Sequence, residues 1–328
     1  MQRDVGVELF RIVCMLGVCL IHSLCQGGYV PQSCGLAGLF TSSVVGFIFI
    51  SGYFGVRLHI RHVKSLLVTG LSCAIIAAIL YHGLYLGELR IFTILDRIRA
   101  YFQYAWFLWM YLALMCMAPA FDPLFENVAD VRALVRRVLP FIVMVFIWSY
   151  ASVKVPIVKR YTPSVCGFGD FSVLTFMGVY LVARSCRVLN VESRAKTWWL
   201  FLIAVVSGLG CWIGICHYNS PFALLFAGSS FFIFKRMKTN DWPLWVVKAV
   251  LCLAPSMFAV YLFHSNSAGF AVIRDAEDYL IGGGRLSYYP ACFLVTAAVF
   301  AGGVVLDLPR RLVVTSFRMI GTKKGSKR

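Results

Sequence analysis

Three ionisable side chains, Glu8, Arg11 and His22, lie in an otherwise apolar stretch near the N-terminus, VGVELFRIVCMLGVCLIHS. Ionisable groups are costly inside a membrane span, so each is a functional candidate if this stretch crosses a bilayer. Eleven residues turn an α-helix about 20° past three full turns, so Arg11 and His22 share one face, about 16 Å apart along the axis. Glu8 lies one turn before Arg11 and can pair with it. This face predicts an anion-binding guanidinium at one end and an imidazole deeper in the membrane.

A neutral imidazole at that depth could act as a general base. It would accept the proton of a hydroxyl group as that hydroxyl attacks a carbonyl carbon, which contributes about 10²–10⁴-fold to a rate. Two structural roles compete with this interpretation. Glu8 and Arg11 could form a cytoplasmic anchor whose arginine snorkels to the surface, and His22 could make an interhelical hydrogen bond. The occurrence of Arg11 and His22 on one face favours function.

The composition predicts that membrane-spanning helices position these residues. Of the 328 residues, 60% are hydrophobic and 14% are charged, and the mean hydropathy is +0.80. Soluble domains are about 25% charged, so a soluble globular fold is excluded. A span needs about 20 apolar residues, which leaves no room for a separate soluble catalytic domain. We expect an all-α, polytopic transmembrane helical bundle of about ten spans, at residues 6–26, 36–56, 66–86, 105–121, 138–153, 167–183, 197–216, 220–234, 246–267 and 288–308.

The distribution of positive charge predicts the orientation of the bundle. The chain has 31 Lys and Arg against 14 Asp and Glu, a net charge of +17. With ten spans and the N-terminus inside, most Lys and Arg fall in inner segments, as the positive-inside rule requires. The charge therefore indicates cytoplasmic termini rather than a nucleic-acid partner. We expect one transmembrane domain over 1–315 and a basic cytoplasmic tail over 316–328, and no His, Cys, Asp or Glu spacing suggests a metal site.

Four sequence landmarks follow one another along the chain. They are Arg11 and His22 separated by ten residues, with Glu8 before them; Ser51, Gly52 and Tyr53 at the end of the second apolar run; Trp106, Phe107 and Leu108, with Pro119 further on; and Tyr261, Leu262 and His264 in VYLFHSN. In this order they resemble the acyltransferase 3 family of membrane O-acyltransferases. The resemblance covers essentially the whole chain and its ten-span layout.

The resemblance implies transfer of an acyl group, commonly acetyl from acetyl-CoA, to a hydroxyl of a cell-envelope glycan or its lipid-linked precursor. It implies a catalytic role for His22 and donor binding by Arg11. We also expect Glu8, which can pair with Arg11, to be a catalytic residue. The family's usual Arg-x-x-Arg at the cytoplasmic start of the third helix becomes Arg61-x-x-Lys64 here, with Arg57 nearby. Lysine keeps the charge but loses arginine's bidentate geometry toward phosphate. We expect Arg57, Arg61 and Lys64 to assist Arg11 in binding the donor's phosphates.

Four further residues are candidates for the acceptor or for the oxyanion that forms during transfer. Ser51 and Tyr53 could donate hydrogen bonds to that oxyanion, and an acyl-Ser51 intermediate is an alternative without a visible base. His264 could orient the acceptor or support His22, or it could serve helix packing alone. Trp106 could stack on a sugar ring, or it could belong to an interfacial aromatic belt.

The sequence therefore predicts a multi-pass enzyme of the plasma (cytoplasmic, or cell inner) membrane that O-acetylates an exopolysaccharide or lipid-linked glycan. Its expected partners are acyl-CoA, the glycan acceptor and the bilayer, with acetyl-CoA as co-substrate and no permanently bound cofactor. A transporter or flippase for a glycan or small organic anion is the alternative, since it would also need intramembrane Arg and His. The lack of an inverted repeat favours the enzyme, and a non-catalytic interaction subunit is the third interpretation.

Overall fold

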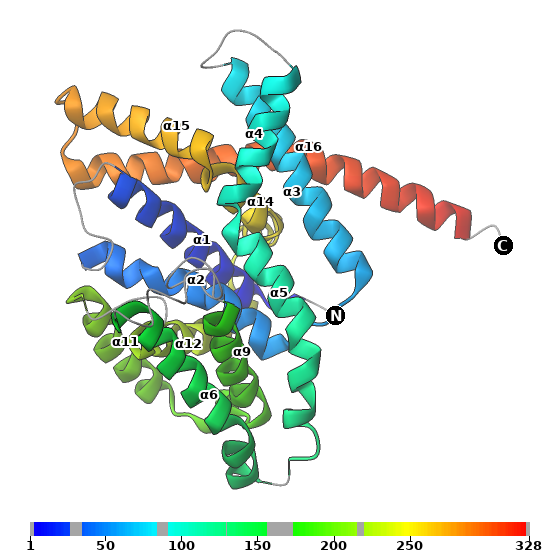
Figure 1. Cartoon of the computed structure of the whole chain (residues 1–328), viewed down its shortest axis with the longest axis vertical. Helices are drawn as coiled ribbons and strands as arrows, with labels where there is room; N and C mark the ends of the chain where they lie inside the picture. Colours follow the sequence, from blue (N-terminus) through cyan, green and yellow to red (C-terminus); the bar gives the residue numbers. More distant parts are fainter. Residues whose placement is uncertain are drawn as a thin grey trace.

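The fold is a bundle of helices in which the described residues form no strand (Figure 1). The computed structural model describes residues 3–26, 35–83, 91–128, 130–155, 173–214 and 220–325. The longer helices are α1 (Val5–Gln26), α2 (Gly35–Phe54), α3 (Ile60–Tyr81), α4 (Ile91–Tyr104), α5 (Trp106–Phe121), α6 (Val131–Lys154), α9 (Val173–Val188), α11 (Thr197–Trp212), α12 (Pro221–Lys235), α13 (Leu244–Leu253), α14 (Met257–His264), α15 (Ser267–Glu277) and α16 (Tyr288–Gly325). Shorter elements are η2 (Asp122–Phe125), α10 (Val191–Arg194), η3 (Thr239–Asp241), η4 (Ala254–Ser256) and η5 (Asp278–Gly282).

Six helical segments in the described part are long and apolar enough to cross a membrane: Val5–Cys25, Gly35–Phe54, Ile60–Tyr81, Trp106–Phe125, Leu244–His264 and Tyr288–Leu312. The helices α11 and α12 are apolar but shorter. The chain is thus a multi-pass, all-helical membrane protein. The count of ten spans and the cytoplasmic termini stay predictions, and residues 167–172, at the start of the predicted sixth span, lie outside the described residues. In Figure 1 the last turns of α16 (red) extend out of the bundle toward the C label.

Three features differ from the simple span pattern. The helices α4 and α15 occupy stretches expected to be loops, and both are amphipathic rather than apolar. The predicted ninth span is interrupted by η4 around Pro255, because proline cannot donate the backbone hydrogen bond that a continuous helix needs. Arg311 of α16 donates to the Cys252 carbonyl at 2.8 Å and to the Ser256 hydroxyl at 3.2 Å beside this break. The helix α16 continues through much of the predicted tail, and residues 326–328 lie outside the described part.

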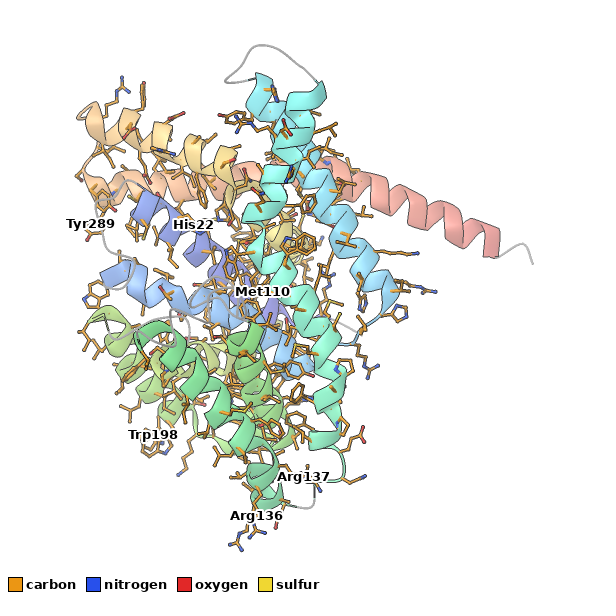
Figure 2. The ribbon with its side chains drawn as sticks, in the orientation of Figure 1. His22, Met110, Arg136, Arg137, Trp198 and Tyr289 are labelled. Atoms are coloured by element: carbon orange, nitrogen blue, oxygen red, sulfur yellow. The ribbon has the colours of Figure 1, made fainter. Side chains whose placement is uncertain are left out.

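The helix α1 lies at the centre of the bundle, where it packs against α2, α12, α14, α15 and α16. A Cβ atom on Gly46 of α2 would lie 2.6 Å from the Cys14 sulfur of α1, so any larger residue at position 46 would require the Cys14 side chain to move. Small residues at such contacts give the close packing that holds membrane helices together. His22 therefore lies in the interior, whereas Trp198 and Arg136 project at the outside (Figure 2).

A buried ion pair ties α16 to α3. Arg310 donates from Nε to Oδ1 of Asp307 at 2.5 Å and from Nη2 to Oδ2 at 3.0 Å. Its Nη1 also donates to the Thr69 hydroxyl of α3 at 3.3 Å. Asp307 is 1% exposed, so its charge depends on this bidentate partner.

Candidate active site

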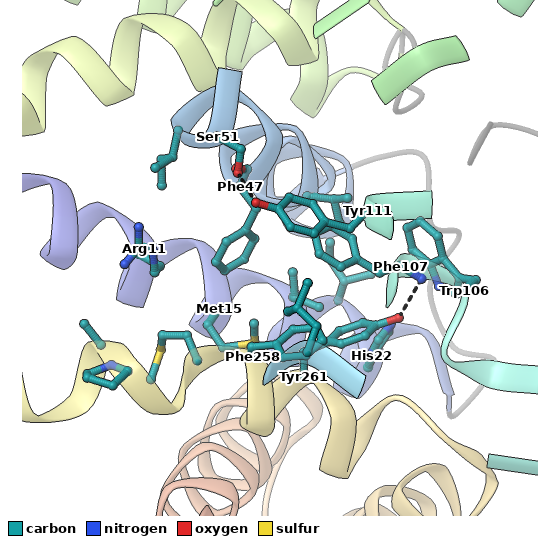
Figure 3. Close-up of a pocket in the computed structure, with 18 of the residues that line it drawn as sticks. Arg11, Met15, His22, Phe47, Ser51, Trp106, Phe107, Tyr111, Phe258 and Tyr261 are labelled. Carbon is teal, nitrogen blue, oxygen red and sulfur yellow. Dashed lines mark hydrogen bonds between the residues drawn. The ribbon is translucent and has the colours of Figure 1, made fainter. Parts of the chain in front are cut away.

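One cavity of about 440 Å³ joins the two most informative residues of the sequence. Its walls come from α1, α2, α5 and α14, with Phe270 of α15 and Leu66 of α3 closing it. The wall is mainly apolar and aromatic, with a few polar groups, as in small-molecule sites generally. The residues labelled in Figure 3 are Arg11, Met15, His22, Phe47, Ser51, Trp106, Phe107, Tyr111, Phe258 and Tyr261.

Arg11 and His22 both line this cavity, which confirms that they share one face of α1. They lie toward its opposite ends, with Met15 between them (Figure 3). Glu8 Oε2 accepts a hydrogen bond from Arg11 Nη1 at 2.6 Å, and the Arg11 side chain remains 32% exposed. Glu8 thus fixes one nitrogen of the guanidinium and leaves its other donors available to a ligand.

The imidazole of His22 is held between two aromatic neighbours. Its ring centroid lies 5.0 Å from that of His264 and 5.1 Å from that of Phe270, which meets it edge-on. Within the described part of the chain, the buried Nδ1 of His22 has no hydrogen-bond partner. His264 does not line this cavity. It packs behind His22 and contacts the Val260 carbonyl through Nδ1 at 2.6 Å.

Two hydroxyl groups meet on the wall opposite α1. Ser51 Oγ donates to the Phe47 carbonyl of its own helix at 3.0 Å and lies 3.3 Å from the Tyr111 hydroxyl of α5. With its hydrogen given to Phe47, Ser51 can accept from Tyr111. None of the basic side chains that the structure describes contacts Ser51 Oγ, so the geometry does not supply the base that an acyl-serine route needs.

The Tyr53 side chain does not line the cavity, although Tyr53 follows Ser51 by only two residues. Its hydroxyl donates to Glu192 Oε2 of α10 at 2.5 Å and accepts from Arg187 Nη1 of α9 at 3.2 Å. Lys235 of α12 extends this cluster by pairing with Glu192 at 3.2 Å. Through these contacts Tyr53 links α2 to α9 and α10, and its hydroxyl makes its hydrogen bonds outside the cavity.

The predicted basic cluster lies at the start of α3 rather than on the cavity wall. Arg57, Arg61 and Lys64 are all exposed, and none lines the cavity. Arg3, which we did not predict as a site residue, lines it together with Arg11. The cavity therefore has a cationic end made by two arginines from the N-terminal segment.

Sequence reasoning also missed the polar role of two tyrosines. Tyr111 joins Ser51 across 60 positions of the chain, and Tyr261 accepts a hydrogen bond from the Phe107 backbone at 3.3 Å. Trp106, which was predicted, lines the cavity near His22 (Figure 3). The aromatic run after position 104 could have suggested Tyr111, but nothing in the sequence pairs it with Ser51.

The arrangement combines a cationic end, a mainly apolar wall, a buried imidazole and a pair of hydroxyl groups on the wall opposite α1. This is the set of groups that an acyl transfer from an anionic carrier needs: charge complementarity for the carrier, a base for the nucleophile and donors for the oxyanion. Across the described ranges, no three His, Cys, Asp or Glu side chains are grouped so that they could hold a metal ion.

Comparison with known proteins points to the same chemistry. The acyltransferase 3 family model, described as an acyltransferase domain, matches residues 4–306. No curated protein and no solved structure matches the chain. The matched region contains the Arg11–His22 cavity and all the helices that build it. The chain therefore belongs to the acyltransferase 3 family and is a membrane acyltransferase.

Proposed function

We propose that this enzyme transfers an acyl group, acetyl in the simplest case, from acyl-CoA to a hydroxyl of a cell-surface polysaccharide or its lipid-linked precursor at the plasma membrane. One observation carries the proposal. Arg11 and His22 lie toward opposite ends of a single cavity of about 440 Å³. A carrier with anionic phosphates at one end and a thioester at the other end of a flexible arm is complementary to that shape.

The phosphates of the donor would bind at the cationic end. Arg11 offers the donors that Glu8 leaves unused, and Arg3 lines the same end. Arg57, Arg61 and Lys64 are exposed and available to the nucleotide part outside the cavity. Guanidinium groups bind phosphate oxygens through short, charge-assisted hydrogen bonds.

The arm of the donor would run along α1 toward His22. Met15 and Val18 line the cavity between the two polar residues and offer an apolar surface to the arm. The helix rise sets about 16 Å between Arg11 and His22 along the axis. The thioester would then stand beside the imidazole.

His22 would act as the general base. A neutral imidazole accepts the proton of the acceptor hydroxyl, whose oxygen forms a bond to the thioester carbonyl carbon. The resulting oxyanion collapses, the carbon–sulfur bond breaks and the imidazolium returns its proton to the departing thiolate. The Tyr111 hydroxyl also lines the cavity and would turn its hydrogen from Ser51 to the oxyanion, whereas the Ser51 hydrogen is donated to its own helix.

The acceptor sugar would approach the His22 end. Trp106 and Phe107 form an aromatic wall there and offer ring faces to a sugar (Figure 3). Aromatic side chains supply large apolar contact area, and tryptophan adds an N–H donor. This wall supports a carbohydrate acceptor over a small aliphatic alcohol.

The test is transfer of label from [acetyl-¹⁴C]acetyl-CoA to extracted envelope glycan by the detergent-purified chain. The His22→Ala variant should lose about 10²–10⁴-fold in transfer at saturating donor while it still binds acetyl-CoA. His62→Ala is the matched control, because His62 is exposed and outside the cavity. Undiminished product formation by His22→Ala would refute the role of His22. A folded chain that neither binds the donor nor transfers label would refute the function.

A further inference from the structure

A second cavity lies behind the His22–His264 pair, and the proposed reaction does not use it. It is a groove of about 500 Å³ between α3, α15 and α16, with the end of α14 at its inner side. In Figure 1, α15 and α16 run side by side, and α3 crosses them. We call this cavity the lateral groove. His264 lines it, while His22 lines the Arg11–His22 cavity, and their ring centroids are 5.0 Å apart.

The walls of the lateral groove suit a hydrocarbon chain. Almost every wall residue is apolar, and small side chains create the hollow: Ala77, Ala268, Gly269, Ala298, Gly302 and Gly303. Rim residues Leu80, Val272 and Leu294 are exposed. Two of them belong to α3 and α16, which are candidate membrane spans. The groove therefore opens toward the hydrocarbon of the bilayer, where a lipid chain can enter sideways.

The lateral groove is also lined by His264, whose Nε2 atom has no hydrogen-bond partner among the described residues. His264 is 2% exposed, and its Nδ1 lies 2.6 Å from the Val260 carbonyl, to which it must donate because a carbonyl can only accept. In the neutral ring, Nε2 is then an acceptor. Nε2 is buried and has no partner among the described residues. A buried acceptor without a donor is costly, so a hydroxyl that enters with the chain would satisfy it.

From these contacts we propose that the lateral groove binds the hydrocarbon chain of a lipid-linked acceptor, and that His264 Nε2 accepts a hydrogen bond from a hydroxyl of its sugar head. The proposal rests on the proposed function and narrows its acceptor to a glycolipid that enters from the bilayer. One hydroxyl of the head group would bind His264 at the inner end of the groove, and the sugar would extend past the His22–His264 pair into the Arg11–His22 cavity, where the donor's thioester arrives.

Gly302 offers a way to fill the groove without disturbing the fold. A Cβ atom there meets no other atom within 4 Å, whereas a Cβ on Gly303 would lie 3.1 Å from the Val260 backbone. Replacing a glycine within a helix also removes an entropic cost of folding. Gly302→Leu should therefore fold and occupy the groove. Ala301→Leu is the matched control, since Ala301 is exposed on the same helix and does not line the groove.

The first experiment measures occupancy directly. The full chain is placed in phosphatidylcholine nanodiscs with a long-chain alkyl glucoside that bears a diazirine at its chain end, and crosslinks are mapped by mass spectrometry. We expect labels on α3, α15 and α16 around the groove. Their yield should fall about tenfold in Gly302→Leu, because the leucine displaces several chain methylenes, and should persist in Ala301→Leu. Equal labelling of both variants, or labels spread over all lipid-facing helices, would overturn the proposal.

The second experiment tests the hydrogen bond to His264. The same probe is compared with its per-O-methylated analogue, which has no hydroxyl donor. The native chain should crosslink the glucoside about tenfold more efficiently than the methylated analogue, as expected for one buried hydrogen bond. His264→Phe keeps the ring but removes the acceptor, so it should label both probes alike. A preference retained in His264→Phe would overturn the assignment of Nε2.

Acyl transfer separates a failure of this proposal from a failure of the proposed function. Crosslinking needs no acyl-CoA, so it reports on the groove even if the chain transfers nothing. If the function holds, Gly302→Leu should lose transfer to a lipid-linked glycan while labelled acetyl-CoA still binds. Transfer to the lipid-linked glycan that is equal in Gly302→Leu and Ala301→Leu would overturn the groove and leave the acyltransferase reaction intact.

Discussion

The guanidinium of Arg11 and the carboxylate of Glu8 are joined by a hydrogen bond of 2.6 Å across one turn of α1. The Glu8 side chain is 9% exposed and that of Arg11 is 32% exposed. The carboxylate thus anchors the guanidinium from the buried side, and Arg11 also lines the cavity. In the function that we propose, this contact would hold Arg11 in place for the phosphates of the donor.

Arg11→Ala should weaken acyl-CoA binding by about 10–100-fold, the range expected for one or two charge-assisted hydrogen bonds. The donor KM should rise while kcat changes little, because the phosphates lie far from the reacting atoms. The donor KM of Arg11→Lys should lie between those of the native chain and Arg11→Ala, since lysine keeps the charge but cannot bind phosphate in the bidentate way of a guanidinium. Steady-state kinetics with varied acetyl-CoA measures this. Arg136→Ala, an exposed arginine near the start of α6, is the control (Figure 2). A normal donor KM in Arg11→Ala would contradict the assignment.

Tyr111→Phe should lower kcat by about 10²–10³-fold with an unchanged donor KM, as for loss of one oxyanion donor. Ser51→Ala should keep most of the activity, because the Ser51 hydrogen is already donated to the Phe47 carbonyl. Parallel kinetics of the two variants distinguish direct transfer from an acyl-serine route. If Ser51→Ala were inactive and Tyr111→Phe normal, the covalent route would be the better account.

Removing Arg310 should destabilise the fold by about 3–5 kcal/mol, because it leaves the Asp307 carboxylate buried without its partner. Arg310→Met is the direct variant. The double variant Asp307→Leu with Arg310→Met should recover most of the loss, since no buried charge remains. Thermal unfolding midpoints in detergent give the comparison. Equal midpoints for the single and double variants would mean that the pair is not coupled.

Glu277 should make stability depend on pH. Burial raises the pKa of Glu277 above its ordinary value. The hydrogen bond from Ser23 lowers this pKa in part, and the negative charge of the nearby Asp278 raises it further. The folded state therefore holds the proton more tightly than the unfolded chain, and this stabilisation is present below the ordinary pKa and lost as the pH rises through the raised one. Glu277→Gln stays neutral, so its unfolding midpoint relative to the native chain should be higher at about pH 7.5 than at about pH 4. A difference that is independent of pH would contradict this.

The sequence predicts the fold best where a long apolar run has no competing signal. The predicted spans at 6–26 and 36–56 lie within two residues of the observed α1 and α2 at either end. The helices α4 and α15 were missed because amphipathic helices lack a long apolar run, although α15 carries Phe270 and Glu277. Hydropathy also treats Leu244–His264 as one span and does not show the break at Pro255.

The residues of the candidate site also fall into two groups, those that the sequence could predict and those that it could not. Arg11 and His22 could be assigned to one cavity wall because both stand on one helix, whose periodicity is fixed. Tyr53 could not be separated from Ser51, because its partner Glu192 lies 139 residues away and only the tertiary packing brings them together. The same limit hid the Tyr111–Ser51 contact. Local spacing therefore predicts faces of single helices, and contacts between helices come from packing.

The helix α1 is unbroken between Arg11 and His22, and this makes it a molecular ruler. The distance along the axis between Arg11 and His22 is set by the backbone hydrogen bonds of the helix, so movements of the surrounding helices leave it unchanged. Insertion of one residue between them would turn His22 by about 100° and take it off the cavity wall. In the function that we propose, the site would therefore be matched to one length of carrier arm, and any adjustment to the size of the acyl group would fall to the opposite wall, formed by α2, α5 and α14.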